Sequence, residues 1–264
     1  RLAEEICMLD HMSKGRLEVG VGRGVSPFEL GYHKVDHDES RAIFFDAYDC
    51  LRTALTNDEF SYEGKYFQYA NVPMPLRPLP TPHPPIWYGS SNPVGATWAG
   101  EQGMHFTANG QPELAKENID AYRTALAKRG GPAQPKGEFP GGAAIGLLRH
   151  IVVADTDEEA ERIARPALEH HADSLNWIRK NYGSSEFTNR LNVHRGADYD
   201  SWRDMNMVIA GSPETVLTEI KRQAEMLGLN YLLTYLFFGN MAFADAKRSM
   251  QLFTNEVMPK LADI

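Results

Sequence analysis

Apolar residues at the start of the chain recur at helical spacing. Leu2, Ile6, Leu9 and Met12 follow this pattern, which predicts a helix that buries the face they share. Residues 13–15 are polar and end in a glycine, as is typical where a helix stops. The first expected element is therefore a helix that ends at about this point.

A short stretch of alternating residues follows this helix. Across residues 17–21, leucine and valine alternate with glutamate and glycine, which predicts a strand. Gly22 and Gly24 then flank Arg23 and allow the backbone to turn sharply. The pattern therefore predicts a cation at the carboxyl end of a buried strand, where an α/β barrel binds anions.

Strand and helix patterns alternate along the rest of the chain. Further strands are expected at 86–88, 104–107, 145–154 and 231–238, and helices at 39–55, 94–102, 112–129, from 156 onward, at 212–228 and at 246–257. The nearly continuous apolar run 231–238 is typical of a parallel strand that is buried on both faces. Five strand–helix units are counted in this way, which predicts an α/β fold with a parallel sheet or barrel.

The sequence also predicts the conformation of four connections between these elements. Residues 60–69 contain two strand-like runs around a Glu-Gly-Lys turn, which predicts a β-hairpin outside the main sheet. Residues 72–85 hold seven prolines and are expected to be extended. Residues 25–38 are expected to form a loop. Residues 182–206 lack a sustained period and predict a long excursion, of the kind that often serves as a lid.

Composition narrows the range of functions. The chain has 264 residues, of which 42% are hydrophobic, so it can bury the core of one large domain. A net charge of −8 argues against nucleic acid or an anionic membrane as the main partner. No apolar run approaches the ~20 residues that span a bilayer, and no signal peptide is visible. Cys7 and Cys50 are expected to be free, buried thiols of a cytoplasmic protein, with a disulfide between them as the alternative.

The glycine-rich residues 20–24 also share features with a dinucleotide-binding fingerprint. That motif requires a helix to open at once, whereas Pro27 and Gly31 intervene here and the helix is expected only near Glu39. We therefore expect no dinucleotide site at this position. Arg23 is then either a surface arginine in a salt bridge or a ligand for an anion, since its guanidinium suits a phosphate.

Ser90 and Ser91 lie between an expected strand and an expected helix. One of them can simply cap the helix. Hydroxyls and free amides at a helix amino terminus can also hold a phosphate. From the residues alone, both interpretations stay open.

Histidines occur in two places that suggest other chemistry. His33, His37 and Asp38 are close in sequence but lack a further ligand at suitable spacing, so no metal site is expected. His170 and His171 are adjacent in an expected helix and point to different sides of it. No Gly-x-Ser-x-Gly motif supports Ser-His-Asp hydrolysis.

Several segments together resemble the bacterial luciferase-like flavin-dependent monooxygenases. They are residues 9–24, 84–91, 249–253 and 257–259, and their order and spacing match the family along nearly the whole chain, least clearly between 183 and 207. The resemblance implies a single domain with a TIM (β/α)8 barrel. Because only five units are counted, it also implies that the first three βα units are not in this sequence.

The resemblance further implies a cofactor and its ligands. Reduced FMN is expected at the carboxyl ends of the strands, with its phosphate at Arg23, Ser90 and Ser91 and its ring beside Gly22, Tyr88 and Gly89. Gly22 would leave room above the flavin ring. Ser90 stands where luciferase-type sequences carry an acidic residue, so the details of this loop are expected to differ from theirs.

Membership of this family would also imply the reaction. Reduced FMN and O2 would form a flavin 4a-hydroperoxide, which oxygenates a small organic substrate, and a separate flavin reductase would supply the reduced flavin. A mobile segment that covers the site would carry His194, Arg195 and Tyr199 as candidate substrate contacts. A homodimer or heterodimer is expected.

Three alternatives stay open at this point. A relative that uses a deazaflavin would transfer hydride and would not react with oxygen. A non-catalytic subunit similar to the β chain of luciferase would bind or stabilise a partner. An unrelated metal-dependent barrel is the third alternative.

Overall fold

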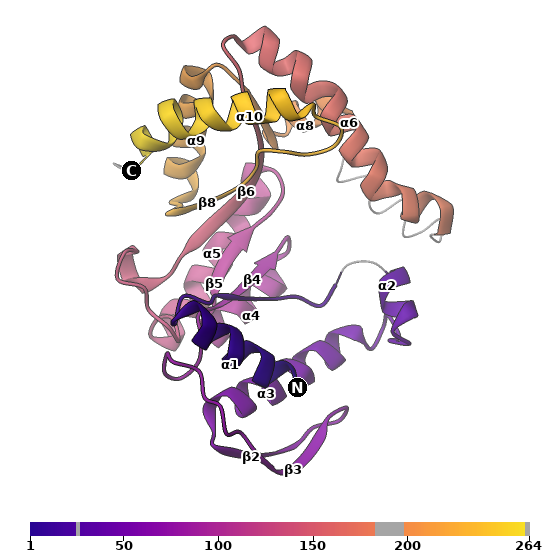
Figure 1. The fold of residues 1–264 in the computed structure, drawn as a ribbon, viewed down its shortest axis with the longest axis vertical. Helices are drawn as coiled ribbons and strands as arrows, with labels where there is room; N and C mark the ends of the chain where they lie inside the picture. Colours follow the sequence, from indigo (N-terminus) through magenta and orange to yellow (C-terminus); the bar gives the residue numbers. More distant parts are fainter. Residues whose placement is uncertain (25–26, 183–197, 262–264) are drawn as a thin grey trace. The chain divides into compact units, whose positions relative to one another are not determined.

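Strands and helices alternate along the chain in the computed structural model, which describes residues 1–24, 27–182 and 198–261 (Figure 1). The contacts between residues divide the chain into two units. The first unit comprises Arg1–Ser90, Val94–Phe106 and Ala121–Ala144, and the second comprises Ser91–Pro93, Thr107–Asp120 and Ile145–Ile264. Each unit has its own strands and its own hydrophobic clusters.

The first unit begins with helix α1 (Leu2–Ser13), which ends where the polar residues predicted, at Lys14 in the left-handed conformation. The predicted buried face is wrong, because Leu9 and Met12 are 51% and 73% exposed. The helix instead buries the face that carries Ala3, Ile6, Cys7 and Asp10. Asp10 can face inward because its Oδ2 accepts a hydrogen bond of 2.7 Å from the backbone N–H of Leu79.

The central strands of the first unit are β1 (Val19–Val21) and β4 (Ile86–Ser90). They pair in parallel, with Val21 opposite Tyr88, and β5 (His105–Ala108) follows β4 in the strand order. Helices α3 (Ser40–Thr56), α4 (Pro93–Gln102) and α5 (Pro112–Arg129) follow these strands along the chain. The helices have the predicted bounds to within a residue or two. Proline and glycine mark the ends of α4 and α5.

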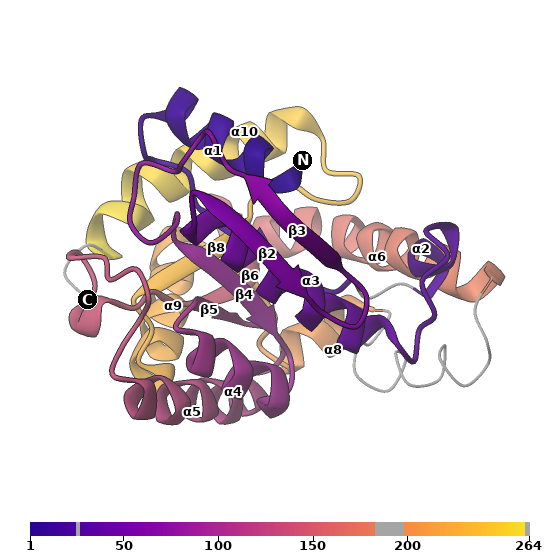
Figure 2. The ribbon, with the colours of Figure 1, turned by 90° about the horizontal axis from the view of Figure 1, so that it is seen from below.

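Two elements of the first unit lie outside these strands. The predicted hairpin is confirmed, with antiparallel strands β2 (Glu59–Glu63) and β3 (Gln68–Pro73) side by side in a separate two-stranded sheet (Figure 2). The predicted loop 25–38 is wrong in part, because α2 (Pro27–Tyr32) is a short helix. Proline at its first position is suited to starting a helix, and this signal was missed.

The second unit has a three-stranded parallel arrangement with β6 (Ile145–Val153) at its centre. Strand β7 (Val208–Gly211) pairs with residues 150–153 of β6, and β8 (Tyr231–Tyr235) pairs with residues 146–150. Strand β7 was not predicted, because its four residues follow the aperiodic stretch. The described residues therefore contain six strands besides the hairpin, in place of the five expected.

Burial of β8 also differs from the prediction. Tyr231 and Tyr235, at its two ends, are 40% and 43% exposed, so the strand is not buried on both faces. It pairs with β6, and no strand pairs with its other edge among the described residues. An edge strand of this kind need not be apolar on both faces, so an apolar run alone could not show its position.

Helices α6 (Asp157–Tyr182), α8 (Tyr199–Asp204), α9 (Pro213–Leu227) and α10 (Phe243–Leu252) complete the second unit, followed by two helical turns at Phe253–Val257 and Met258–Leu261. Side chains cap the first turns of α6 and α9. The Thr156 hydroxyl accepts a hydrogen bond from the Glu159 N–H, and Ser212 does the same for Thr215. Gly228 ends α9 in the left-handed conformation.

Parallel pairing and the alternation of strands with helices confirm the α/β class. Cys7 and Cys50 are free and buried, so the alternative disulfide is not formed. Of the helices in the described part of the chain, none combines the length and apolar character needed to cross a membrane.

Candidate functional site

The carboxyl ends of β1 and β4 form one edge of the first unit. Because Val21 lies opposite Tyr88 in a parallel pair, Gly22 and Arg23 leave β1 beside the point where Gly89 and Ser90 end β4. The structure thus brings together residues that are more than 60 positions apart in the sequence. This edge is where ligands bind in α/β proteins.

Arg23 is oriented by the beginning of α3. Its Nη1 donates a hydrogen bond of 2.8 Å to the Oγ of Ser40, and that hydroxyl donates in turn to the carbonyl oxygen of His37 at 2.6 Å. Ser40 is only 2% exposed, so this contact is fixed. No described acidic side chain forms an ion pair with Arg23. The salt-bridge interpretation of Arg23 therefore finds no support in the described residues.

Tyr88 is held by a cluster of aromatic rings from three elements. Its ring stacks on Phe44 of α3 at a centroid distance of 5.9 Å and meets the edge of Trp98 of α4 at 5.0 Å. Phe45 and Tyr48 also pack on Trp98. The end of β4 is therefore fixed against both helices.

The pKa of Tyr88 reflects its burial and two nearby arginines. Burial raises the pKa of its hydroxyl, and the charges of Arg23 and Arg41 oppose this rise because they favour the phenolate. Arg41 is a candidate site residue that the sequence interpretation missed. A signal was present, since Arg41 lies in the first turn of α3, where the helix dipole disfavours a cation unless an anion is near.

Ser90 lies directly against the first turn of α4. A Cβ atom on Gly95 would come within 2.5 Å of the Ser90 Oγ and 3.3 Å of the Tyr88 ring. A glycine at this position therefore allows the helix to approach the end of the strand. Ser90 is 6% exposed, and Ser91 follows it as the first residue of the second unit. Helix capping and phosphate binding both remain compatible with this arrangement.

The edge also has room for a flat ligand. A Cβ atom on Gly22 would meet no other atom within 4 Å. Donors from Arg23, a second cation at Arg41 and open space beside Gly22 together fit a phosphorylated ring compound. Flavin mononucleotide is one compound of this kind.

The structure does not place the candidate substrate contacts at the carboxyl edge of β1 and β4. His194 and Arg195 lie outside the described residues. Tyr199 is 2% exposed in a hydrophobic cluster of the second unit, where the guanidinium of Arg165 lies 4.6 Å from its ring centroid. This position gives Tyr199 a role in packing, and its contact with substrate remains an expectation from the resemblance alone.

The end of the expected excursion 182–206 is packed structure rather than a loop. Tyr199–Asp204 forms α8, and its Trp202 is 4% exposed in the same cluster as Tyr199. Burying two large aromatic side chains stabilises this short helix. The prediction of a lid therefore fails for residues 199–204, while residues 183–197 lie outside the described part of the chain.

Metal binding finds no support among the described residues, which contain no group of three or more potential ligands. His37 and Asp38 are close, at 3.6 Å, but both side chains are exposed. The ring centroids of His171 and His150 are 5.0 Å apart, whereas His170 is exposed.

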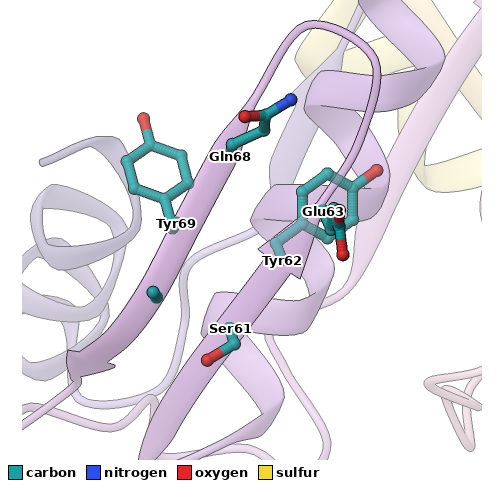
Figure 3. A pocket seen from close by; sticks show the side chains of 6 residues that line it. Ser61, Tyr62, Glu63, Gln68 and Tyr69 are labelled. Atoms are coloured by element: carbon teal, nitrogen blue, oxygen red, sulfur yellow. The ribbon is translucent and has the colours of Figure 1, made fainter.

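A depression of about 470 Å³ lies on the hairpin, away from the strand ends. It is lined by Ser61, Tyr62, Glu63, Gln68, Tyr69 and Ala70. Figure 3 shows that these side chains come from the two hairpin strands alone. The depression is open and has no cationic side chain in its lining, so it does not suit a phosphate.

Comparisons with known proteins identify the family of this chain. The family described as luciferase-like monooxygenase matches residues 1–231. The uncharacterized protein y4wF of Sinorhizobium fredii (strain NBRC 101917 / NGR234) is 32% identical over 261 residues, which cover 99% of this chain and 73% of that protein.

Two solved structures share the fold. Monooxygenase RslO1 from Streptomyces bottropensis is 25% identical, with a TM-score of 0.76 over 98% of this chain and 73% of that one. The oxygenating constituent of 3,6-diketocamphane monooxygenase from Pseudomonas putida, solved in complex with FMN, is 21% identical, with a TM-score of 0.74 over 98% and 75% of the two chains. The chain therefore has a TIM-barrel-like α/β fold and belongs to the luciferase-like monooxygenase family.

Proposed function

We propose that this chain is an FMN-dependent monooxygenase that uses reduced FMN and O2 to oxygenate a small organic substrate. The observation that carries the proposal is Arg23, which follows β1 at the shared carboxyl edge of β1 and β4 and is oriented by Ser40, with Arg41 in the first turn of α3 as a second cation. Arg23 and Arg41 both act on Tyr88, and neither is neutralised by an ion pair with a described residue. Arg23 at this edge, with Arg41 on the neighbouring helix α3, favours a phosphate dianion.

Each residue of the edge then has a definable part in holding the cofactor. Arg23, oriented by Ser40, would bind the phosphate through its remaining N–H groups. Ser90 and Ser91 would donate hydroxyl hydrogen bonds at the start of α4. Gly22 and Gly89 carry no side chain, so the ring can approach the backbone closely.

The chemistry itself would belong to the cofactor. Reduced FMN supplies the electrons that activate O2 when it is bound. The chain would bind the cofactor, orient the substrate beside it and exclude water. This division explains why no acid–base pair is needed at the edge formed by β1 and β4.

The names of similar proteins support a flavin but do not choose among its forms. One neighbour was solved with FMN, and another is an F420-dependent secondary alcohol dehydrogenase, 20% identical with a TM-score of 0.72. A deazaflavin is therefore the second candidate cofactor. A flavin reductase that supplies reduced FMN, and a dimeric assembly, belong to the same proposal.

Anaerobic titration with reduced FMN, followed by O2 and a time-resolved absorption spectrum, tests the proposal. We expect saturable binding and then a slow, enzyme-dependent return to oxidised FMN. Binding of a reduced deazaflavin that does not react with O2, together with no binding of reduced FMN, would support the second candidate. Absence of binding for both would favour a non-catalytic subunit.

A further inference from the structure

The loop of residues 130–144 joins α5 to β6, and its last residue is fixed to β5 by two hydrogen bonds. The N–H of Phe106 donates to the carbonyl oxygen of Ala144 at 3.0 Å, and the N–H of Ala144 donates to the Nδ1 of His105, also at 3.0 Å. All three residues belong to the first unit, whose last residue is Ala144. The second bond differs from the first, because its acceptor is a side chain that can take up a proton.

Two further contacts hold the 130–144 loop. The N–H of Ala133 donates a hydrogen bond of 2.8 Å to the carbonyl oxygen of Gly103. The ammonium group of Lys136 forms an ion pair with the carboxylate of Glu18, just before β1. Neither contact changes when an imidazole takes up a proton, so the loop has fixed points that do not depend on His105.

The hydrogen bond from Ala144 determines which form of His105 the structure can hold. A backbone N–H can only donate, so the Nδ1 that accepts it carries a lone pair and the ring proton is on Nε2. An imidazolium has an N–H at both positions and offers no acceptor. Uptake of a proton therefore replaces the bond by two N–H groups that face each other. His105 and Ala144 are 1% and 0% exposed, so solvent cannot replace the lost acceptor unless the loop moves.

The neighbours of His105 act on its proton affinity in both directions. Its ring lies against the indole of Trp87 in β4, with a centroid distance of 5.1 Å. Burial lowers the pKa of His105, and the ammonium group of Lys136 acts in the same direction. The groups that oppose this shift favour the imidazolium, and they are the carboxylates of Glu18 and Glu138 and the backbone of Gln134. Because the net shift is downward from 6.5, the ring is neutral at pH 7 and can accept the bond.

We propose that His105 is an acid-sensitive contact that fixes the end of the 130–144 loop. The neutral ring holds Ala144, and with it the point where the chain enters β6. The protonated ring releases the N–H of Ala144, so the end of the loop opens to solvent. The inference does not depend on the proposed function, because His105 and Ala144 lie at the amino ends of β5 and β6 and not at the edge that carries Arg23.

The contact has a defined direction with pH. Because the folded chain holds His105 with a lowered pKa, the opened or unfolded chain takes up the proton first as the pH falls below 6.5. The stabilisation is therefore fully present above this value and is lost toward lower pH. One proton changes the equilibrium constant for opening by at most about tenfold per pH unit.

His83 offers a matched comparison in the same unit. It is 4% exposed, and burial lowers its pKa as well. Its Nδ1, however, lies 2.8 Å from the carbonyl oxygen of Pro84, which can only accept, so the ring donates this bond. A proton added to His83 leaves its hydrogen bond in place.

Hydrogen exchange of the Ala144 amide in the full chain, measured between pH 7 and pH 5 and corrected for the intrinsic rate, tests the proposal. We expect its protection factor to fall by about tenfold over this range. His105→Asn keeps an oxygen that can accept the bond but does not titrate, so its protection factor should stay constant. His83→Asn is the control, and in this variant the Ala144 amide should lose protection as in wild type.

A second measurement needs no variant, and so remains decisive where His105→Asn does not fold. Long-range ¹H–¹⁵N spectra of the wild-type ring should show the proton on Nε2 at pH 7. A proton on Nδ1 at pH 7 would overturn the proposal. Constant protection of the Ala144 amide down to pH 5 in wild type, or an equal loss of protection in wild type and His105→Asn, would overturn it as well.

Discussion

The Nη1 of Arg23 donates a hydrogen bond to the buried Oγ of Ser40 at 2.8 Å, and so ties the loop after β1 to the first residue of α3. One branch of the guanidinium is thereby held by the protein, while other N–H groups point away from this contact. A guanidinium oriented in advance loses less freedom when it binds an anion.

Arg23→Ala should weaken the binding of reduced FMN by about 2–3 kcal/mol, as expected for loss of a charge-assisted hydrogen bond. Riboflavin lacks the phosphate and should be affected far less. Titration of both ligands followed by flavin fluorescence measures the difference. Equal losses for the two ligands would contradict the assignment of Arg23 to the phosphate.

Arg41→Gln should also lower the affinity for FMN, and the loss should shrink as salt is added, because exposed charges are screened. Isothermal titration at low and high ionic strength provides the measurement. Arg52→Gln is a suitable control, since Arg52 lies on the same helix but approaches Asp49 at 3.5 Å. A change as large in the control would mean that the net charge, and not the position of Arg41, sets the affinity.

Gly95→Ala should destabilise the chain by about 1–3 kcal/mol, because the added methyl group overpacks the contact between α4 and β4. The new Cβ atom would lie 2.5 Å from the Ser90 Oγ. Gly31→Ala in α2 is the matched control, since a Cβ atom there meets nothing within 4 Å. Chemical denaturation of both variants measures their free energies of unfolding. Equal values for the two variants would contradict the close approach of α4 to β4 at Gly95.

Asp46→Asn should reduce the loss of folding stability that occurs as the pH is lowered. The carboxylate of Asp46 accepts hydrogen bonds from the Tyr62 hydroxyl at 2.7 Å and from the N–H groups of Tyr66 and Phe67. These bonds, that of Tyr62 foremost, lower the pKa of Asp46 below its ordinary value of 3.8.

The sign of the effect follows from the lowered pKa. A depressed pKa in the folded state stabilises the fold above the unfolded value, and this gain is lost as the pH falls through the folded value. Denaturation midpoints between pH 7 and pH 2 should therefore fall more steeply for wild type than for Asp46→Asn. Asp49→Asn, at a carboxylate with an exposed contact to Arg52, should follow the wild-type slope.

Trp202→Ala should destabilise the chain by about 3–5 kcal/mol, the usual cost of deleting a buried tryptophan. Trp202 is 4% exposed in the cluster that also holds Tyr199. Trp177→Ala, at an exposed position, should cost much less. If the two variants were equally stable, residues 199–204 would behave as a loosely held segment, as the sequence pattern suggested.

Local chemistry allowed much of the architecture to be predicted from the sequence. Proline at position 112 and glycine at 130 mark the two ends of α5, and Ser212 and Gly228 mark those of α9. Such signals act within a few residues, because they set the backbone angles or satisfy the unpaired groups of a helix end. That Arg23 and Ser90 belong to one site was implied only by the resemblance to the luciferase-like family, and the parallel pairing of β1 with β4 brings the two strand ends to a shared edge.

Contacts between residues far apart in the sequence determine which side chains face inward and which ones meet, and the hydrophobic pattern does not show this. The carboxylate of Asp10 accepts a hydrogen bond from the N–H of Leu79, 69 positions away. Asp10 therefore lies on the buried face of α1, and Leu9 lies on the exposed face. Arg41 acts on Tyr88, and Trp87 donates to Glu18. The sequence does not show that these residues meet, because their contacts depend on the packing of α1 and α3 and, for Trp87 and Glu18, on the register of β1 with β4. The sequence by itself determined most of the strands and helices, with α2, α8 and β7 as exceptions. The tertiary structure decided which side chains meet, because those free energies come from contacts that exist only after the chain has packed.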